Sequence, residues 1–187
     1  MKVSQGEVEA MLRKAARGAG WTWGYAEELG ASVRALEASR LPGIALGASL
    51  LTQADLEHCP IRLAARAADT GELPAEPVLL RCPLLSLPVL AGSFCRADDA
   101  ISIAWPGGTA SATDFDRVHC DADDLAIDSQ PVPVNFTRLR SHSAPVAEPA
   151  RNAITAADSD WQTLERFALG SYVPASEQSR LGAGPTD

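Results

Sequence analysis

The sequence predicts an α+β fold, because helix-type and strand-type patterns occupy separate parts of the chain. Helix-type spacing of apolar residues fills residues 1–71 and returns over residues 158–170, whereas residues 78–140 contain short apolar runs broken by proline and glycine. Segregated elements of this kind are typical of α+β domains. The 187 residues are the usual length of one domain. We therefore expect residues 1–187 to form one domain, in which an N-terminal αα-hairpin and a C-terminal helix pack on a small, mostly antiparallel sheet.

The first predicted helix begins at Ser4. Ser4 is a preferred N-cap residue, and Glu7 stands where a capping box requires an acidic or amide side chain. Val3 and Val8 occupy the two positions of a hydrophobic staple. A Gly-Ala-Gly sequence at residues 18–20 ends this helix, because glycine readily adopts the left-handed conformation of a helix C-terminus.

A second helix is predicted from near Thr22 to about Arg40, which completes the αα-hairpin. Its apolar residues follow one helical stripe: Ala26, Leu29, Val33 and Leu36. Residues 44–71 are rich in alanine and are also expected to be mostly helical. Pro60 suits the first turn of a helix in this stretch, and Gly71 suits its end.

The middle of the chain is predicted to be mainly strand. Residues 78–82 and 84–90 are apolar runs punctuated by prolines, which is typical of edge or irregular strands. Residues 100–105 and 109–113 flank a Pro-Gly-Gly sequence and predict a hairpin, with a type II turn or a longer loop between its strands. Apolar and polar residues alternate from Val132 to about Arg140, which predicts a further strand.

A final helix is predicted over residues 158–170, followed by an ordered tail. Ser159 and Gln162 resemble a capping box, and Gly170 ends the helix. The apolar residues of this helix share one face: Trp161, Leu164, Phe167 and Ala168. The tail is unusual, because chain ends are normally polar and frayed, whereas residues 172–184 combine aromatic, apolar and ionisable side chains.

The charge distribution excludes some classes of partner. The chain has a formal net charge of −8, and residues 69–130 carry eleven acidic residues against three basic ones. Without a basic stripe the chain is a poor candidate for nucleic-acid binding, which depends on Lys and Arg contacts to phosphates. No run approaches the roughly 18 consecutive apolar residues of a membrane helix. We therefore expect neither nucleic acid nor a membrane as a partner.

The N-terminus has no apolar segment of the kind found in secretory signals, and we expect a cytoplasmic protein. The four cysteines form no C-x-x-C pair: Cys59, Cys82, Cys95 and Cys120. Buried, reduced thiols are expected rather than a zinc site or a redox pair. His58 and His119 each precede a cysteine, but neighbouring side chains in an extended chain point apart, so no Cys–His dyad is expected.

The first candidate site segment is the corner between the two N-terminal helices. Trp21, Trp23 and Tyr25 form a dense aromatic group, which either fills the corner or forms the wall of a ligand pocket. The glycines around them do not indicate a phosphate loop, because this segment joins two helices instead of following a strand. Glu27 and Glu28 either complement the dipole of the second helix or act as acid/base catalysts.

The second candidate site segment is the C-terminal tail. Its polar and aromatic candidates for ligand binding are Tyr172, Ser176, Glu177, Ser179 and Arg180. These side chains either converge on a carboxylate-bearing ligand, with Arg180 as a bidentate donor, or fix the tail to the core. In the second case Glu177 and Arg180 form a weak pair three residues apart.

A run of acidic residues from Asp114 to Asp128 is the candidate metal site of the sequence. Oxygen ligands suit Ca²⁺ or Mg²⁺, and His119 would extend the set to transition metals. The run departs from the EF-hand pattern, because residues 121–124 lack the third acid and the glycine in register. A solvated strand edge explains the same residues. We assign no metal ligand, and the sequence identifies no cofactor.

Two segments resemble a proteobacterial family of unknown function. They are Ala-Arg-Gly-Ala-Gly-Trp-Thr-Trp-Gly-Tyr-Ala-Glu-Glu at residues 16–28 and Tyr-Val-Pro-Ala-Ser-Glu-Gln-Ser-Arg-Leu-Gly-Ala-Gly at residues 172–184. The resemblance implies that both terminal segments belong to one module of a bacterial protein. That family has no assigned activity, so the resemblance implies no catalytic residues.

These observations support two hypotheses about function. In the first, the protein binds or transforms a small anionic metabolite between the helical corner and the tail. Arg180 would hold the anion, Glu27 or Glu28 would act as acid or base, and Trp23 and Tyr172 would form walls. In the second, a non-catalytic subunit uses its acidic surface to bind a basic protein or to assemble into a homo-oligomer.

Overall fold

The structure is a computed structural model that describes residues 1–95, 99–127, 130–140 and 153–171. The helices are α1 (Gln5–Gly18), α2 (Trp23–Ala38), α3 (Gly43–Gln53), α4 (Pro60–Thr70), the 3₁₀ helix η1 (Pro83–Ser86), α5 (Leu87–Phe94) and α6 (Asp158–Leu169). The strands are β1 (Lys2–Ser4), β2 (Val78–Leu80), β3 (Asp99–Trp105), β4 (Gly108–Asp114), β5 (Arg117–Ala122), β6 (Val132–Arg140) and β7 (Ala153–Thr155). The predicted α+β class is confirmed.

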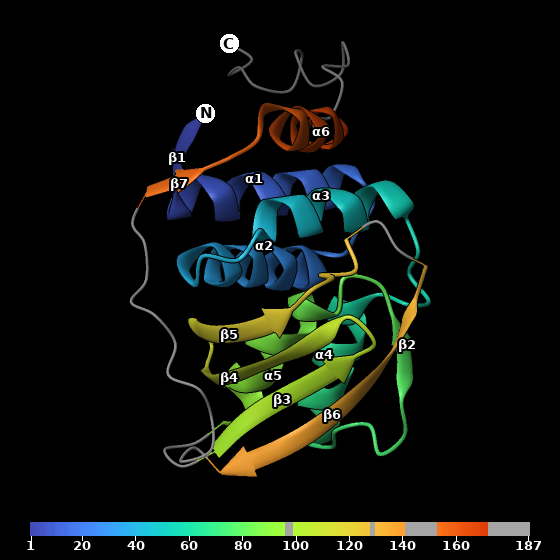
Figure 1. Cartoon of the computed structure of the whole chain (residues 1–187). Coiled ribbons are helices and arrows are strands. Elements are labelled where there is room, and N and C mark those ends of the chain that lie inside the picture. Colours follow the sequence, from blue (N-terminus) through green and yellow to red (C-terminus); the bar gives the residue numbers. More distant parts are fainter. Residues whose placement is uncertain (96–98, 128–129, 141–152, 172–187) are drawn as a thin grey trace, which may run out of the picture.

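In Figure 1, α6, α1 with α3, and α2 form successive layers above strand β5, whereas α4 and α5 lie behind the strands of the antiparallel sheet. The five-stranded sheet has the order β2-β6-β3-β4-β5, and β1 pairs separately with β7. Helix α5 packs on β3 and β4, and α2 contacts β5. Helix α6 packs on α1 and α3 instead of on the sheet. The C-terminal helix therefore lies farther from the sheet than expected, because α5 occupies the place beside the strands.

The predicted start of α1 is confirmed. The Ser4 hydroxyl accepts a hydrogen bond from the Glu7 backbone N–H at 3.3 Å, and the Glu7 carboxylate accepts one from the Ser4 backbone N–H at 2.7 Å. These bonds form a complete capping box and lower the pKa of Glu7. Val3 and Val8 are both buried, as a hydrophobic staple requires. The first helix is thus fixed at its start by local interactions that the sequence specifies.

The αα-hairpin is also confirmed, and its apolar stripe is buried. Ala26, Leu29, Val33 and Leu36 of α2 are all inaccessible to solvent. Helix α1 also packs on α6, and this contact is close at Gly18. A Cβ atom on Gly18 would lie 1.7 Å from the carbonyl oxygen of Phe167, so no larger residue fits without movement of the backbone. The end of α6 is therefore held against the corner between α1 and α2.

The prediction of a strand over residues 84–90 is wrong, because this run forms η1 and the first half of α5. Pro83 lies in the first turn of η1 and Pro88 in the first turn of α5, where a missing N–H is tolerated. Every residue from Cys82 to Ala91 is buried. A run that is buried on all sides has no polar face, so its period does not distinguish helix from strand.

The predicted hairpin of residues 100–113 is present as β3 and β4, joined by Pro106 and Gly107. The type II turn, one of the two predicted connections, is wrong, because Gly107 does not have the positive φ that this turn requires. Glycine is needed there for close packing instead. A Cβ atom on Gly107 would lie 2.6 Å from the carbonyl oxygen of Asp124. The Trp105 indole N–H donates to the same oxygen at 2.8 Å.

The C-terminal helix begins two residues earlier than a capping box at Ser159 would require. Ala157 occupies the N-cap position and makes no side-chain cap, and Ser159 lies inside the first turn. The buried face of α6 is as predicted, with Trp161, Leu164 and Ala168 in the core. The β1–β7 pair was not predicted, because each strand has three residues and its partner is distant in the sequence.

The contact at Gly18 gives a first testable prediction. We expect Gly18→Ala to lower the free energy of unfolding by about 1–3 kcal/mol, because the methyl group overlaps a backbone carbonyl. Gly6→Ala, in the same helix, is the matched control, because a Cβ atom at Gly6 meets nothing within 4 Å. It should leave stability unchanged or raise it by up to about 1 kcal/mol. Urea denaturation followed by circular dichroism measures the unfolding free energy of both variants. Equal effects of the two substitutions would contradict the close contact between Gly18 and Phe167.

Candidate functional site

The aromatic residues of the corner lie in three different environments. Trp21 is 7% exposed and belongs to the core. Tyr25 is half-buried. Trp23, the first residue of α2, is 61% exposed. The core-filling alternative therefore applies to Trp21, whereas Trp23 presents its ring to solvent and is available to a ligand.

A cavity of about 390 Å³ lies at this corner. The described residues that line it are Arg13, Lys14, Arg17, Trp23, Gly170 and Ser171. The close contact between Gly18 and Phe167 brings the end of α6 to the end of α1, and this places Ser171 at the cavity. Ser171 directly precedes the tail. The five predicted binding residues of the tail, Tyr172, Ser176, Glu177, Ser179 and Arg180, lie outside the described residues.

The lining of the corner cavity carries three cations and no carboxylate among its described residues. Within the described part of the chain, Arg13, Lys14 and Arg17 form no ion pair. The C-terminal ends of α1 and α6 also lie here, and each contributes roughly half a negative charge. Three full positive charges exceed that contribution. The corner is therefore a locally cationic site in a chain whose net charge is −8.

Arg17 is the cation of the cavity whose position is fixed most clearly. Its Nη1 donates a hydrogen bond to the carbonyl oxygen of Trp21. Its Cζ lies 4.8 Å from the centroid of the Trp23 ring, within the range of a cation–π contact. A guanidinium has five N–H donors, so these contacts leave donors for a ligand. They hold Arg17 and Trp23 together as one preorganised pair.

The amino-terminal end of α2 lies at the same corner. Thr22 is its N-cap residue but makes no side-chain cap, and the first turn contains no acidic residue. Glu27 and Glu28 lie beyond that turn, where the influence of the helix dipole has declined. Burial raises the pKa of Glu28, and the charge of Glu27 raises it further. Neither is among the described residues of the cavity lining, so their catalytic role stays a prediction.

The three basic residues of the lining were missed in the sequence analysis. They stand at positions i, i+1 and i+4 on the polar side of α1, and basic residues on such a side are ordinary in amphipathic helices. Their convergence depends on the packing of α6 and on the turn at Trp21. The one local signal is that no acidic residue lies between Ala10 and Ala26.

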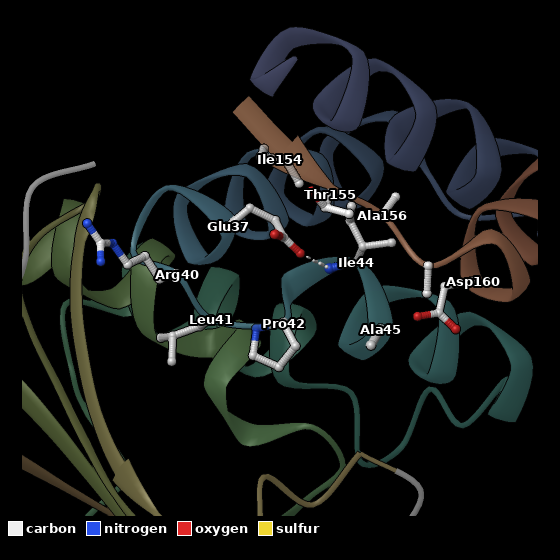
Figure 2. A pocket seen from close by; sticks show the side chains of 11 residues that line it. Glu37, Arg40, Leu41, Pro42, Ile44, Ala45, Ile154, Thr155, Ala156 and Asp160 are labelled. Atoms are coloured by element: carbon white, nitrogen blue, oxygen red, sulfur yellow. Dashed lines mark hydrogen bonds between the residues drawn. The ribbon is translucent and has the colours of Figure 1, made fainter. Parts of the chain in front are cut away.

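A second cavity, of about 310 Å³, lies between α2, α3, β7 and α6. In Figure 2 the carboxylate of Glu37 points to the backbone nitrogen of Ile44. The Ile44 N–H donates to Glu37 Oε1 at 2.8 Å. Pro42, the N-cap residue of α3, makes no side-chain cap, so Glu37 supplies the cap from α2. Burial raises the pKa of Glu37, although the N–H groups of Ile44 and Gly43 lower it. These contacts give Glu37 a structural role.

Asp55 joins the loop after α3 to Arg81, the residue that follows β2. Asp55 accepts hydrogen bonds from Arg81 Nε at 2.8 Å and from His58 Nδ1 at 2.9 Å. The bond from Arg81 is the largest of the effects that lower the pKa of Asp55. His58 therefore bonds a carboxylate and not Cys59. Cys59 is buried, and burial raises the pKa of its thiol.

The thiols and the acidic run are also placed by the structure. Cys59 and Cys82 are buried as predicted, whereas Cys95 and Cys120 are partly exposed, and all four are free. Strand β5 lies at the edge of the sheet, and the aspartates around it are exposed, as the strand-edge alternative predicted. Over residues 1–95, 99–127, 130–140 and 153–171, no group of three or more His, Cys, Asp or Glu residues is arranged to hold a metal ion. No described helix has both the length and the apolar character needed to cross a membrane.

The fold and the corner cavity define an α+β protein with a cationic, aromatic-walled surface site. Residues 3–71 match the model of a family described as "Protein of unknown function (DUF3726)". The match includes α1 to α4 and supports the resemblance to a family of unknown function, whereas the resemblance of the particular segment 16–28 and the proteobacterial origin stay expectations. It does not extend to residues 172–184, whose resemblance stays an expectation. Neither the curated proteins nor the solved structures include a match to this chain.

The cap on α3 gives a second testable prediction. Glu37→Ala leaves the Ile44 N–H without its acceptor, so we expect the free energy of unfolding to fall by about 1–2 kcal/mol. Glu37→Gln keeps an acceptor oxygen without a charge and is the matched control. It should retain most of the stability in urea denaturation at pH 7. Equal losses of unfolding free energy in the two variants would show that Glu37 does not stabilise the protein through its hydrogen bond to the Ile44 N–H.

The same pair of proteins tests the raised pKa of Glu37. Because its folded-state pKa lies above the ordinary value of 4.5, folding favours the protonated form. The associated stability is present at low pH and is lost as the pH rises through the raised pKa. The unfolding free energy of Glu37→Gln minus that of the wild type should therefore increase between about pH 4 and pH 7. A constant or decreasing difference would contradict the raised pKa.

Proposed function

We propose that this protein binds a small anionic metabolite with a planar or aromatic part at the corner cavity. The observation that carries the proposal is the convergence of Arg13, Lys14 and Arg17 beside the exposed ring of Trp23. Cations that have no ion pair within the described chain gain most from an external anion. The volume of about 390 Å³ lies within the range of roughly 300–1,000 Å³ that is typical of small-molecule sites.

The basic residues and the aromatic residue of the lining would contact different parts of the ligand. Arg17 is already held against Trp23, so it would present its free N–H groups to a carboxylate or phosphate with little loss of entropy. Arg13 and Lys14 would add charge-assisted hydrogen bonds. The flat part of the ligand would lie on the free face of Trp23. The unpaired N–H groups at the start of α2 would give further donors for the anion.

In this proposal the tail supplies further ligand contacts. Ser171 lines the cavity, and Tyr172, the next residue in the sequence, would supply a second wall. Arg180 would add a bidentate donor, with Ser176, Glu177 and Ser179 as polar neighbours. If the bound metabolite is transformed, Glu28 is the better suited of the two acids, because its raised pKa favours a protonated donor. Glu27 is the alternative.

A second candidate function is the docking of a basic protein, or of another copy of this chain, on an acidic surface around β5. This surface consists of Asp114, Asp116, Asp121, Asp123 and Asp124, which are all exposed. However, Asp116 pairs with Arg34 at 3.1 Å and Asp114 with Arg117 at 3.4 Å. Internal pairing weakens the attraction for a partner, so we prefer the metabolite site.

Fluorescence of Trp23 tests the metabolite site directly. Trp23 is 61% exposed, whereas Trp21, Trp105 and Trp161 are at most 7% exposed, so a ligand at the corner should quench mainly Trp23. We expect AMP, which combines a planar base with a phosphate, to quench this emission more strongly than inorganic pyrophosphate or phthalate. Trp23→Phe should remove the response, and calorimetry should give the affinity.

Variants of the cations complete this test. Lys14→Ala and Arg13→Ala should each weaken AMP binding about tenfold or more, since a charged hydrogen bond contributes about 1.5–3 kcal/mol. Arg166→Ala, which removes a cation from the exposed side of α6, should leave binding unchanged. The proposal would be wrong if none of the three probes binds at millimolar concentration, or if Arg166→Ala weakens binding as much as Lys14→Ala.

Size-exclusion chromatography at low and high salt tests the acidic-surface alternative. An assembly held by exposed charges should dissociate when the salt concentration rises, because exposed charges are screened. A single, salt-independent monomer that co-purifies with no other protein would argue against this alternative. The double variant Asp121→Asn with Asp123→Asn should dissociate at low salt, as the wild-type assembly does at high salt.

A further inference from the structure

A cavity of about 730 Å³ lies apart from the corner site. It is bounded by the start of α2, the loop before α4, α4 itself and β2. The described residues that line it are Tyr25, Leu56, Glu57, Cys59, Arg62, Leu63, Arg66, Asp69, Val78 and Leu80. No residue is shared with the described lining of the corner cavity.

The most buried residues in the lining of this α4–β2 cavity are apolar. Cys59 and Leu80 are both 1% exposed, and Leu63 and Val78 are half-buried. Leu56 is 46% exposed, which is unusual for a large aliphatic side chain that lines a cavity. An apolar ligand in this space would remove Leu56 and the walls from water, and that burial is favourable.

Two arginines stand at the mouth of the α4–β2 cavity. Arg62 and Arg66 are four residues apart on α4, so their side chains lie on the same face of the helix. Arg62 Nη1 donates to the carbonyl oxygen of Leu56 at 3.0 Å, which restrains this side chain at the lining of the cavity. The guanidinium of Arg66 has no partner among the described residues. Two guanidinium groups on one face are suited to bind one carboxylate.

The acidic residues of the same lining do not neutralise these arginines. Glu57 and Asp69 are exposed, and neither forms an ion pair within the described chain. Asp69 lies in the last turn of α4, where the helix dipole disfavours a second negative charge. An anionic group at the mouth is therefore best placed near Arg62 and Arg66, one turn away from this end.

The first turn of α2 separates the two cavities. Trp23 and Tyr25 are two residues apart, which corresponds to about 200° around a helix. Trp23 lines the corner cavity and Tyr25 lines the α4–β2 cavity. A ligand in one cavity therefore contacts a different aromatic ring from a ligand in the other, so each site can be tested separately.

We propose that the α4–β2 cavity binds an amphipathic carboxylate, with its apolar body against Leu63, Val78 and Leu80 and its carboxylate on Arg62 and Arg66. A medium-chain fatty acid has this chemistry. The volume of about 730 Å³ accommodates such a chain within the usual range for ligand sites. The proposal does not depend on the function proposed for the corner.

Displacement of the fluorescent sulfonate 1-anilinonaphthalene-8-sulfonate by decanoate tests this site. We expect the folded protein to enhance the emission of the dye and decanoate to reverse the enhancement. Arg66→Glu should weaken decanoate binding at least tenfold. Arg166→Glu, the same change on the exposed side of α6, is the matched control and should have no effect. Circular dichroism establishes that each variant is folded.

Two further variants keep the test decisive. Leu56→Ser changes an exposed side chain and should weaken decanoate binding without loss of the fold. Trp23→Phe should leave decanoate binding unchanged, which distinguishes this site from the corner. The proposal would be overturned if Arg66→Glu and Leu56→Ser bind decanoate as the wild type does. It would also be overturned if dodecyltrimethylammonium binds more tightly than decanoate and loses affinity in Glu57→Gln with Asp69→Asn.

Discussion

The close contact of α1 with its neighbours, at positions where there is no room for a side chain, determines how the helical layers are arranged. A Cβ atom on Gly18 would overlap the Phe167 carbonyl of α6, and one on Gly30 of α2 would lie 2.8 Å from the Glu9 carbonyl of α1. Backbones that approach this closely exclude water and fix the position of each helix. Because α6 is held at Gly18, Ser171 lines the same cavity as Trp23. The corner cavity depends on this contact more than on any residue of its own lining.

The parts of the fold that local sequence determines could be predicted. The capping box of Ser4 and Glu7 involves neighbours along the chain, and the apolar stripe of α2 is a property of one helix. Helix α5 could not be predicted in the same way, because complete burial removes the polar face that reveals a helical period. The pairing of β1 with β7 requires contact between the two ends of the described chain, and no local pattern encodes that contact.

The candidate site shows the same division between local and long-range information. A pocket wall formed by Trp23 was one of two alternatives for the aromatic cluster, and the other was that its rings fill the corner. The cations Arg13, Lys14 and Arg17 were not expected, since their polar side of α1 is an ordinary solvent-facing surface until α6 is placed next to it. The glycine of the β3–β4 turn also depends on a long-range contact. The sequence indicated a turn at Gly107, but the need for glycine arises from Asp124, which is distant in the sequence.

A contribution to stability does not by itself explain why three cations and the exposed ring of Trp23 lie at the corner. Trp23 buries little of its ring, so it contributes much less to the core than Trp21 does. Basic residues near the ends of α1 and α6 do stabilise the helix dipoles, but typically by about 0.3–1 kcal/mol each at exposed positions, and one such residue would serve. Three cations and an exposed indole together exceed this structural requirement. The net charge of −8 repels anions at long range, yet that repulsion is screened beyond about 8–10 Å at physiological salt, so within the cavity the local cations dominate. A site of this kind would select anions by contact and not by long-range attraction.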